Sequence, residues 1–332
     1  MTSVLLVGVG AVGDRAGRQL AQTPGIDRIL IADRRRERAE GLRRHIGARA
    51  TVVEWRPRDR LPGPVDVVAC ALPPGDDVPL VLAALDAATP VATSGDEHDG
   101  IATLLRLDGE ARARGVTVLA GCGLAPGLSD VLAAHAASLL DSVDEIHVAR
   151  AGIAGAKSEA SLRRVLSDRA SEVRHGEIAE VRRRTTHELV YFPEPVGAQE
   201  CEMVGVGIDL LADAFPGVDR ITARAVEPPP RTRGLFSRED PGGRWGATKV
   251  EVWGRVGAVR VPVVYGAAGR TATVGGTVLA VATAALAGAL PTLEGQHLGV
   301  HGLASVVAPT AFLAELASRG VTASRFEGVP VS

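Results

Sequence analysis

The sequence is poor in lysine and cysteine, and each scarcity bears on what the protein can be. Of its 37 basic residues only Lys157 and Lys249 are lysines, and 39 acidic residues bring the net charge to −2. This balance gives no overall attraction to nucleic acid or to an anionic membrane. The cysteines, Cys70, Cys122 and Cys201, are far apart in the chain. They fit a reducing cytoplasm and lack the spacing of a metal site.

Long apolar runs and aromatic clusters are also missing. The most apolar stretch, residues 278–290, is rich in alanine and shorter than the ~20 residues of a membrane-spanning helix. It predicts a close-packed helix inside the protein or at a dimer interface. The N-terminus has no basic region before its apolar residues 4–7, so it does not read as a signal peptide. Aromatic residues make up 3% of the chain and form no stacking surface for nucleic acid.

What is present is enough for two domains. A chain of 332 residues, 46% of them hydrophobic, can bury a large core. Over the first third, short apolar runs alternate with helical patterns, which predicts an α/β domain with a doubly wound parallel sheet. The expected strands are residues 4–7, 28–32, 51–54, 65–71, 90–92 and 116–119. The expected helices are residues 14–22, 34–46, 78–88 and 104–114.

The pattern becomes α+β after residue 122. We expect a first domain at residues 1–122 and a second at 123–332, with C-terminal helices able to pack back on the first. The second begins with a helix at 127–140, and its expected strands are residues 145–149, 185–192, 220–226, 249–256 and 258–264. The last two can form a hairpin around Val256 and Gly257. Residues 227–245 are rich in proline, arginine and glycine, which predicts either a mobile lid or a surface loop.

A glycine-rich turn follows the first expected strand. Gly8-Val-Gly10-Ala-Val-Gly13 opens a helix, and an acidic residue stands at the end of the next strand. This context is typical of a dinucleotide-binding Rossmann domain. Gly8 allows the tight turn, Gly10 lets the backbone approach a pyrophosphate, and Gly13 lets helix and strand pack closely. The N–H groups of the helix start, around Ala11 and Val12, would hold the pyrophosphate.

The acidic residue, Asp33, favours NAD as the cofactor. It is placed to bind the adenosine ribose hydroxyls, and its charge opposes a 2′-phosphate. Arg34 has the opposite effect, because an arginine after this strand can hold a 2′-phosphate, so NADP is the alternative. Further cofactor contacts are expected from neighbouring strand ends on the same edge of the sheet, at Ala71, Leu72, Pro73, Ser94 and Gly95.

Several motifs together resemble the saccharopine dehydrogenase-like oxidoreductases. They are the glycine fingerprint, Cys-Ala-Leu-Pro-Pro at 70–74, Val-Ala-Thr-Ser-Gly at 91–95 and Gly-Cys-Gly-Leu-Ala-Pro-Gly at 121–127. A looser C-terminal pattern, with Gly-Gly-Thr at 275–277 before an alanine-rich helix, extends the resemblance over nearly the whole chain. Gly121 replaces an acidic residue that the family often has, so the substrate of no single member can be carried over.

The resemblance implies a Rossmann domain joined to an α+β domain that binds substrate and forms a homodimer. The implied reaction is nicotinamide-linked oxidation of an amine, or reduction of an imine, in an amino acid or polyamine conjugate. Two alternatives stay open. The enzyme could retain NAD, cycle it internally and catalyse a net transfer or condensation, or the protein could bind a nucleotide without catalysis.

Substrate contacts are expected where the two domains join. Gly123, Pro126 and Gly127 lie at this junction, and the helix that follows could hold a substrate carboxylate at its N-terminus. Glu97 is also expected to contact the substrate, because it follows a strand end on the sheet edge where the cofactor is expected. A carboxylate of the substrate could also be bound by an arginine. We name Arg150 as the candidate, and other arginines of the second domain remain open.

Three residues are candidates for catalysis. His98 could carry a proton near neutral pH, although its loop could simply cap the next helix. Lys157 could bind a carboxylate or assist imine chemistry, or be an ordinary loop lysine. Cys122 lies in the junction turn and could contact substrate. No metal is expected, because the chain has no His-Glu-x-x-His pattern.

Overall fold

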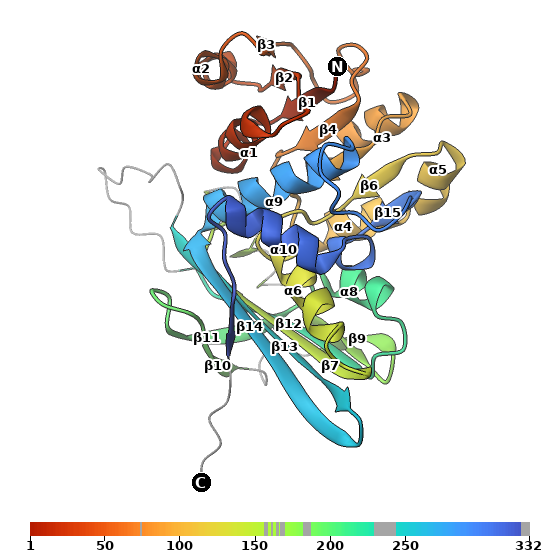
Figure 1. The fold of residues 1–332 in the computed structure, drawn as a ribbon, viewed down its shortest axis with the longest axis vertical. Helices are drawn as coiled ribbons and strands as arrows, with labels where there is room; N and C mark the ends of the chain where they lie inside the picture. Colours follow the sequence, from red (N-terminus) through yellow and green to blue (C-terminus); the bar gives the residue numbers. More distant parts are fainter. Residues whose placement is uncertain are drawn as a thin grey trace.

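Two β-sheets with helices packed around them make up the protein (Figure 1). The structure, a computed structural model, describes residues 1–73, 75–155, 159–160, 162–163, 166, 170–181, 187–228 and 244–326. In Figure 1 the first sheet lies at the top and the second at the bottom. The helices α9 (Thr271–Leu286) and α10 (Pro309–Ser318) lie between them.

The first sheet is parallel throughout, as the alternating pattern predicts. Its seven strands run in the order β15-β6-β5-β4-β1-β2-β3. The strands from the first third of the chain are β1 (Ser3–Val7), β2 (Arg28–Ala32), β3 (Ala50–Val52), β4 (Val67–Cys70), β5 (Val91–Thr93) and β6 (Thr117–Leu119). Their helices are α1 (Ala11–Gln22), α2 (Arg36–Ile46), α3 (Val78–Asp86), α4 (His98–Leu105) and α5 (Asp108–Ala113).

The seventh strand comes from the far end of the chain. β15 (Gly299–His301) pairs in parallel with β6, so that Val300 lies beside Val118. The sequence analysis did not predict this strand, because three residues are too short to show a strand pattern. Its presence means that the C-terminal part of the chain returns to complete the first sheet.

The second sheet is mixed and has nine strands. They follow the path β10-β11-β12-β7-β13-β14-β16, with β8 paired to β12 and β9 to β8. Only β12 and β7 pair in parallel among these strands of the described chain. The strands are β7 (Ser142–Ala151), β8 (Ala170–Arg174), β9 (Glu177–Val181), β10 (Glu188–Tyr191), β11 (Ala198–Val204), β12 (Arg220–Val226), β13 (Trp245–Val256), β14 (Val259–Arg270) and β16 (Ser324–Phe326).

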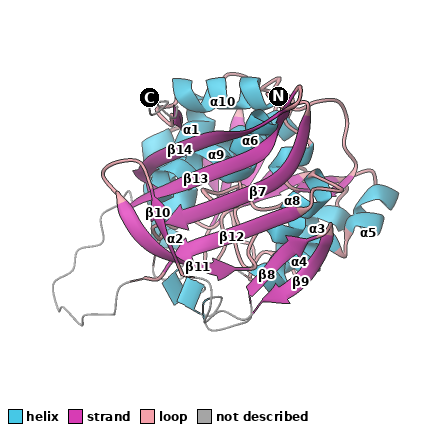
Figure 2. Ribbon diagram, turned by 90° about the horizontal axis from the view of Figure 1, so that it is seen from below, coloured by secondary structure: helices cyan, strands magenta, loops and turns pink. Residues whose placement is uncertain are grey.

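Helices cover one face of the second sheet. Figure 2 shows the strands in front and α6 (Leu128–Ala137), α9 and α10 behind them. The short elements α8 (Ile208–Ala214) and η2 (Leu303–Ser305) lie on the same side. β13 and β14 form the predicted hairpin, in which Val256 pairs with Val259 and Gly257 has a φ of 58°.

The helix expected at residues 104–114 is wrong. The chain instead forms α4 and α5, with Arg106 and Leu107 between them. Ile101 and Leu104 of α4 and Ala111 of α5 are all buried in the core. Most of the loop expected at 227–245 lies outside the described residues.

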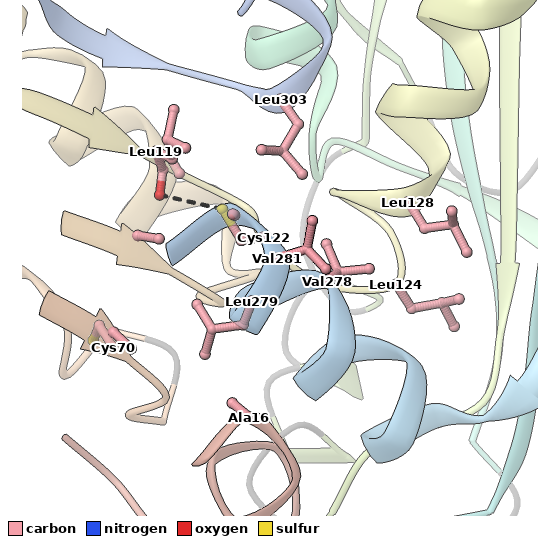
Figure 3. Packing of buried hydrophobic residues seen from close by; sticks show 14 of the residues in the cluster. Ala16, Cys70, Leu119, Cys122, Leu124, Leu128, Val278, Leu279, Val281 and Leu303 are labelled. Carbon is pink, nitrogen blue, oxygen red and sulfur yellow. Dashed lines mark hydrogen bonds between the residues drawn. The ribbon is translucent and has the colours of Figure 1, made fainter. Parts of the chain in front are cut away.

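The apolar helix expected at 278–290 is an internal one. It starts earlier, as α9, and only Thr273 and Leu286 within it are not buried. One side packs on α1 and lies against β4 and β5, and another meets β13 and β14 of the second sheet. Figure 3 shows Val278, Leu279 and Val281 of α9 in the core between the two sheets. Alanine and glycine suit this position because they let neighbouring backbones approach closely.

Adjacent glycines in α9 offer a direct test of this packing. A Cβ at Gly276 would lie 2.5 Å from the Val12 carbonyl oxygen of α1, whereas a Cβ at Gly275 would meet nothing closer than 3.9 Å. We expect Gly276→Ala to lower the free energy of unfolding by about 1–3 kcal/mol, because α1 must move. Gly275→Ala should leave it unchanged or raise it by up to about 1 kcal/mol through helix propensity. Urea unfolding of both variants measures this, and equal effects would contradict the packing argument.

Candidate functional site

The glycine turn after β1 combines two closed positions with one open position. Gly8 has a φ of 94°, and a Cβ there would lie 2.5 Å from the Ala71 carbonyl oxygen. A Cβ on Gly13 would lie 1.8 Å from the Gly8 carbonyl oxygen. A Cβ on Gly10 would meet nothing within 4 Å. The fold therefore needs Gly8 and Gly13, while Gly10 leaves its backbone open to an approaching ligand.

The open glycine leads into a helix start that suits an anion. Gly10 is the N-cap of α1, which begins at Ala11, and Val12 and Gly13 complete its first turn. The first N–H groups of a helix have no partner within it, and they carry partial positive charge. This is the arrangement that holds a pyrophosphate in a dinucleotide site.

Asp33 ties the end of β2 to this turn. Its Oδ2 accepts a hydrogen bond of 2.6 Å from the Val9 N–H, and its Oδ1 accepts one of 2.7 Å from the Arg35 N–H. Each carboxylate oxygen has a second lone pair, so ribose hydroxyls can still donate to it. Arg34 beside it is exposed. The carboxylate is therefore held at the turn that carries the open glycine, which fits the adenosine end of a dinucleotide.

Two loops border the site where β4 and β5 end. Ala71, Leu72 and Pro73 follow β4, and all three are partly exposed at the edge of the sheet. Ser94 follows β5, and its N–H donates to the Cys70 carbonyl oxygen at 3.0 Å. The two loops are therefore held side by side, as their assignment to one cofactor site requires.

A buried carboxyl that the sequence analysis missed supports the loop after β5. Thr93 donates its hydroxyl to Asp77 at 2.9 Å, and the Gly95 N–H donates to the same Thr93 hydroxyl at 3.1 Å. Asp77 is 2% exposed, and burial raises the pKa of its carboxyl. Its place just before α3 reads as an ordinary helix start in the sequence, so only the folded chain reveals its contact with β5.

The junction loop is a compact turn at residues 121–127. The Ala125–Pro126 peptide is cis, and Gly127 has a φ of 123°. A Cβ on Gly127 would lie 2.3 Å from the Gly123 carbonyl oxygen, and one on Gly123 would lie 3.9 Å from the Ser94 carbonyl oxygen. Gly123 is thus next to the loop after β5, while Pro126 and Gly127 are buried.

The expected carboxylate site at the N-terminus of the next helix is wrong. α6 begins at Leu128, and its first N–H groups are already used. Leu128 and Ser129 donate to the Gly123 and Leu124 carbonyl oxygens at 2.9 and 3.1 Å. Asp130 also donates, to the Gly127 carbonyl oxygen at 3.0 Å. A helix start whose donors are satisfied by its own loop has none left for a substrate.

Arg150 joins three parts of the molecule at the junction. Its Nη1 donates to Asp96 Oδ2 at 2.9 Å and to the Ala125 carbonyl oxygen at 2.6 Å. The side chain is 11% exposed, and its Nε is buried with no hydrogen-bond partner in the described part of the chain. The other arginines of the second domain are placed differently: Arg224 pairs with Glu188 at 2.9 Å, and Arg270 lies over the Trp245 ring.

His98 and Glu97 also lie at the edge where the two domains meet. His98 is the first residue of α4, and its Nδ1 lies 3.4 Å from Asp209 Oδ2 of α8. A Cβ on Gly75, in the loop after β4, would lie 2.8 Å from Glu97 Oε2. The structure therefore brings Glu97, His98 and Arg150 to the loop that follows β5.

Of the other two catalytic candidates, Cys122 does not join this group. Cys122 is fully buried, and its Sγ lies 3.5 Å from the Leu119 carbonyl oxygen within the core (Figure 3). Burial raises the pKa of its thiol, so the thiol stays neutral and has no access to substrate. The predicted role of Cys122 in the chemistry is therefore wrong, and the residue belongs to the hydrophobic core. Lys157 lies outside the described residues.

Asp130 is a second buried carboxyl that the sequence analysis did not single out as a site residue. It is 1% exposed, and burial raises the pKa of its carboxyl to about 7. Ser129 donates to its Oδ1 at 2.8 Å. With Pro126, Val148 and Arg150 it lines a small cavity of about 10 Å³, room for about one water molecule.

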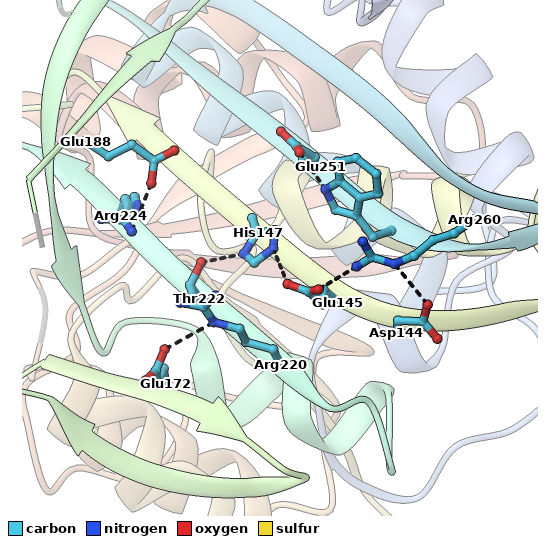
Figure 4. A network of polar contacts seen from close by, with 11 residues as sticks. Asp144, Glu145, His147, Glu172, Glu188, Arg220, Thr222, Arg224, Glu251 and Arg260 are labelled. Carbon is cyan, nitrogen blue, oxygen red and sulfur yellow. Dashed lines mark hydrogen bonds and ion pairs between the residues drawn. The ribbon is translucent and has the colours of Figure 1, made fainter.

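The opposite face of the second sheet carries a separate polar network (Figure 4). His147 Nδ1 lies 2.8 Å from the Thr222 hydroxyl and its Nε2 lies 3.1 Å from Glu145. Burial lowers the pKa of His147. Because side chains alternate along β7, His147 points away from the face that carries Arg150, so this network is not part of the junction site.

No helix among the described residues is both long enough and apolar enough to cross a membrane. No group of three or more histidine, cysteine, aspartate or glutamate side chains is arranged there to hold a metal ion.

Comparison with known proteins shows which fold this is. No protein-family model matches the chain. Apo saccharopine dehydrogenase (L-Glu forming) from Saccharomyces cerevisiae is similar in structure with a TM-score of 0.69 at 15% identity, over 98% of this chain and 100% of that one. C. glutamicum DAP dehydrogenase in complex with DAP matches with a TM-score of 0.53 at 16% identity, over 96% and 98% of the two chains.

An engineered D-amino acid dehydrogenase bound to NADP+ is also similar, with a TM-score of 0.52 at 15% identity over 96% of this chain and 99% of that one. The fold is therefore the one that these dehydrogenases share over nearly their whole length. It confirms the expected combination of a Rossmann sheet with a second, mixed sheet.

The open glycine gives a first test of the nucleotide site. Gly10→Val should fold normally, because a side chain there meets no atom of the protein, but it should fill the place of the pyrophosphate. We expect NADH and NADPH to bind at least about 30-fold more weakly, a loss of about 2 kcal/mol, in isothermal titration calorimetry. Gly109→Val is the control, since Gly109 also has open space around it and lies in α5. Unchanged binding in Gly10→Val would rule out this turn as the pyrophosphate site.

Asp130 gives a test based on pH. Its folded pKa is raised above the unfolded value, so its contribution to stability is complete below about pH 4 and is lost as pH rises through about 7. Asp130→Asn has no carboxyl to titrate, so it does not suffer that loss. The difference in the free energy of unfolding between the variant and wild type should therefore favour the variant by a few kcal/mol more at pH 8 than at pH 4. Urea unfolding at both pH values measures the difference. The same effect of the substitution at both would show that the carboxyl does not titrate as described.

Proposed function

We propose that the protein is an NAD(P)-dependent oxidoreductase that acts on a carbon–nitrogen bond in a substrate with a carboxylate group. The observation that carries this proposal is the placement of Arg150 beside the loop after β5, which leaves the same edge of the first sheet as the open glycine turn. The fold shared with amino-acid dehydrogenases supports the oxidoreductase class. NAD is the cofactor we favour, with NADP as the alternative, because Asp33 faces the ribose position.

The residues present fit a dinucleotide. Gly10 leaves room for the pyrophosphate, the first turn of α1 offers N–H donors, and Asp33 offers acceptors for the ribose hydroxyls. The backbone of the loops that end at Pro73 and Gly95 would flank the nicotinamide. The bound nicotinamide would supply or accept the hydride, and the protein contributes position and electrostatics.

Arg150 would bind the substrate carboxylate. Asp96 and the Ala125 carbonyl oxygen take one of its terminal nitrogens, which fixes the guanidinium in place. Its Nε has no partner among the described residues, so a carboxylate that reaches it relieves an unsatisfied buried donor. A guanidinium offers two parallel donors along its Nε edge, which matches the geometry of a carboxylate.

His98 would exchange the proton with the substrate nitrogen. It begins α4, directly after the loop that carries Ser94 and Gly95, and its side chain is 38% exposed, so a proton can reach it. Histidine is suited to this role because it changes charge near neutral pH. A homodimer in the cytoplasm remains our expectation for the assembly and location of the protein.

The test is an assay with pairs of substrates that differ only in the carboxylate. Purified protein is mixed with NADH or NADPH and a set of amine and carbonyl compounds, and products are identified by mass spectrometry. We expect reductive formation of a C–N bond, with kcat/KM falling at least about 100-fold in Arg150→Gln for the carboxylate substrate. For the matched substrate without the carboxylate, Arg150→Gln should change kcat/KM less than about 3-fold.

Two results would contradict the proposal in different ways. Turnover that does not depend on the carboxylate, or that falls equally for both substrates in Arg150→Gln, would remove Arg150 as the anchor. Oxidation of the reduced cofactor by ketones alone, with an alcohol as product and no nitrogen incorporated, would place the reaction on a carbon–oxygen bond instead.

A further inference from the structure

His98 meets an acidic side chain from the other part of the chain. Its Nδ1 lies 3.4 Å from Oδ2 of Asp209, in the first turn of α8. His98 begins α4, which follows β5 of the first sheet, and α8 packs on β12 and β8 of the second sheet. The pair therefore spans the contact between the two sheets.

The two facing atoms are both unsatisfied. His98 Nδ1 and Asp209 Oδ2 are both buried, and neither has a hydrogen-bond partner in the part of the chain that the structure describes. Buried polar atoms in folded proteins are nearly always paired. A separation of 3.4 Å between a ring nitrogen and a carboxylate oxygen shortens to a hydrogen bond with a small side-chain rotation, as such contacts do when a ligand binds.

The turn before α8 lies beside the pair. A Cβ on Gly205, in this turn, would lie 3.5 Å from His98 Nδ1, an ordinary contact distance, and 3.0 Å from the Ser171 hydroxyl oxygen. The Asp209 side chain is 19% exposed, and burial raises the pKa of its carboxyl while the His98 ring opposes that rise. Of the carboxyl, Oδ2 is the buried atom, and it faces the ring.

A carboxylate at Nδ1 decides which nitrogen of a histidine carries the hydrogen. It accepts the Nδ1–H, so in the neutral ring the Nε2 lone pair stays free. It also stabilises the imidazolium that forms when Nε2 takes up a proton. Without the carboxylate, the hydrogen of the neutral ring can lie on Nε2, and a protonated Nε2 cannot act as a base.

We propose that Asp209 is the positioning residue for His98, holding the Nδ1–H tautomer so that Nε2 exchanges the proton of the substrate nitrogen. This inference rests on the proposed function for the identity of the proton donor. In amine oxidation, an N–H bond of the substrate ammonium breaks, its electron pair stays on nitrogen, and the proton forms a bond to Nε2. In imine reduction the same proton returns to nitrogen. Because the two residues come from different sheets, the proton-transfer group is complete only when the sheets are in contact.

The first experiment reads the tautomer directly and needs no substrate. Nitrogen NMR of protein labelled in its 8 histidines distinguishes a protonated Nδ1 from a protonated Nε2, and His98→Gln identifies the His98 signals by their loss. We expect the Nδ1–H form of His98 in the wild-type protein at neutral pH. In Asp209→Asn and Asp209→Ala we expect a mixture with a large Nε2–H fraction. A tautomer that is the same in wild type and both variants would overturn the inference.

The second experiment separates orientation from stability. Asp209→Asn should lower kcat by about 10²–10³-fold while the KM for the cofactor changes less than about 2-fold, because only the base is misplaced. Asp213→Asn is the matched control, since Asp213 is an exposed residue of the same helix. It should leave both constants unchanged. A kcat for Asp209→Asn within about 3-fold of wild type would overturn the positioning role.

The two experiments keep this inference distinct from the proposed function. If His98 has the expected tautomer dependence on Asp209 but His98→Gln retains full turnover, Asp209 still positions His98 but the proton leaves by another route, and the inference fails at its catalytic step. If wild-type protein shows no C–N oxidoreduction, the proposed function fails while the tautomer result still decides the contact between Asp209 and His98.

Discussion

The packing of α9 on α1 is the contact on which the rest of the site depends. Val12 belongs to the turn that would hold a pyrophosphate, and its carbonyl oxygen leaves no room for a side chain on Gly276. One residue earlier, Gly275 lies near both Val12 and Gly123 of the junction loop. A single helix therefore fixes the distance between the nucleotide turn and the junction. It can do so because alanine and glycine bring three backbones close together with no bulky side chains between them.

The loop after β5 is the second point at which the molecule is held together. Asp77 and Thr93 support it from below within the first sheet. Asp96 and His98 meet Arg150 and Asp209 from the second sheet. A negative and a basic side chain of one short loop thus face a positive and an acidic partner. Such an arrangement fixes the loop in one register, since a shift of one residue would bring like charges together.

Buried and half-buried carboxyls give the junction a chemical character that the surface does not have. Asp77, Asp130 and Asp209 all have a raised pKa because burial disfavours the charged form. They belong to different elements, yet all lie at or beneath the contact between the sheets. Groups of this kind gather at functional sites more often than elsewhere. Their position agrees with a reaction in which protons move at the junction while the nucleotide turn supplies only binding.

Local sequence was sufficient for the features that depend on neighbours along the chain. The glycine turn from Gly8 to Gly13, Asp33 after the next strand, the parallel sheet and the hairpin at Gly257 all follow from short-range patterns, because turn geometry and side-chain alternation are local properties. The edge position of His98 and Arg150 could be expected as well, but their partners could not.

Asp209 lies more than a hundred residues from His98 in the chain, Asp77 reads as an ordinary helix start, and β15 is three residues long. The sequence also left two candidates that the structure excludes. Cys122 is buried, and the first N–H groups of α6 already have hydrogen-bond partners. Residue types and turns are therefore written into the sequence, whereas burial, pairing and shifted pKa values were decided only by the tertiary structure, because they depend on which distant segments exclude water from one another.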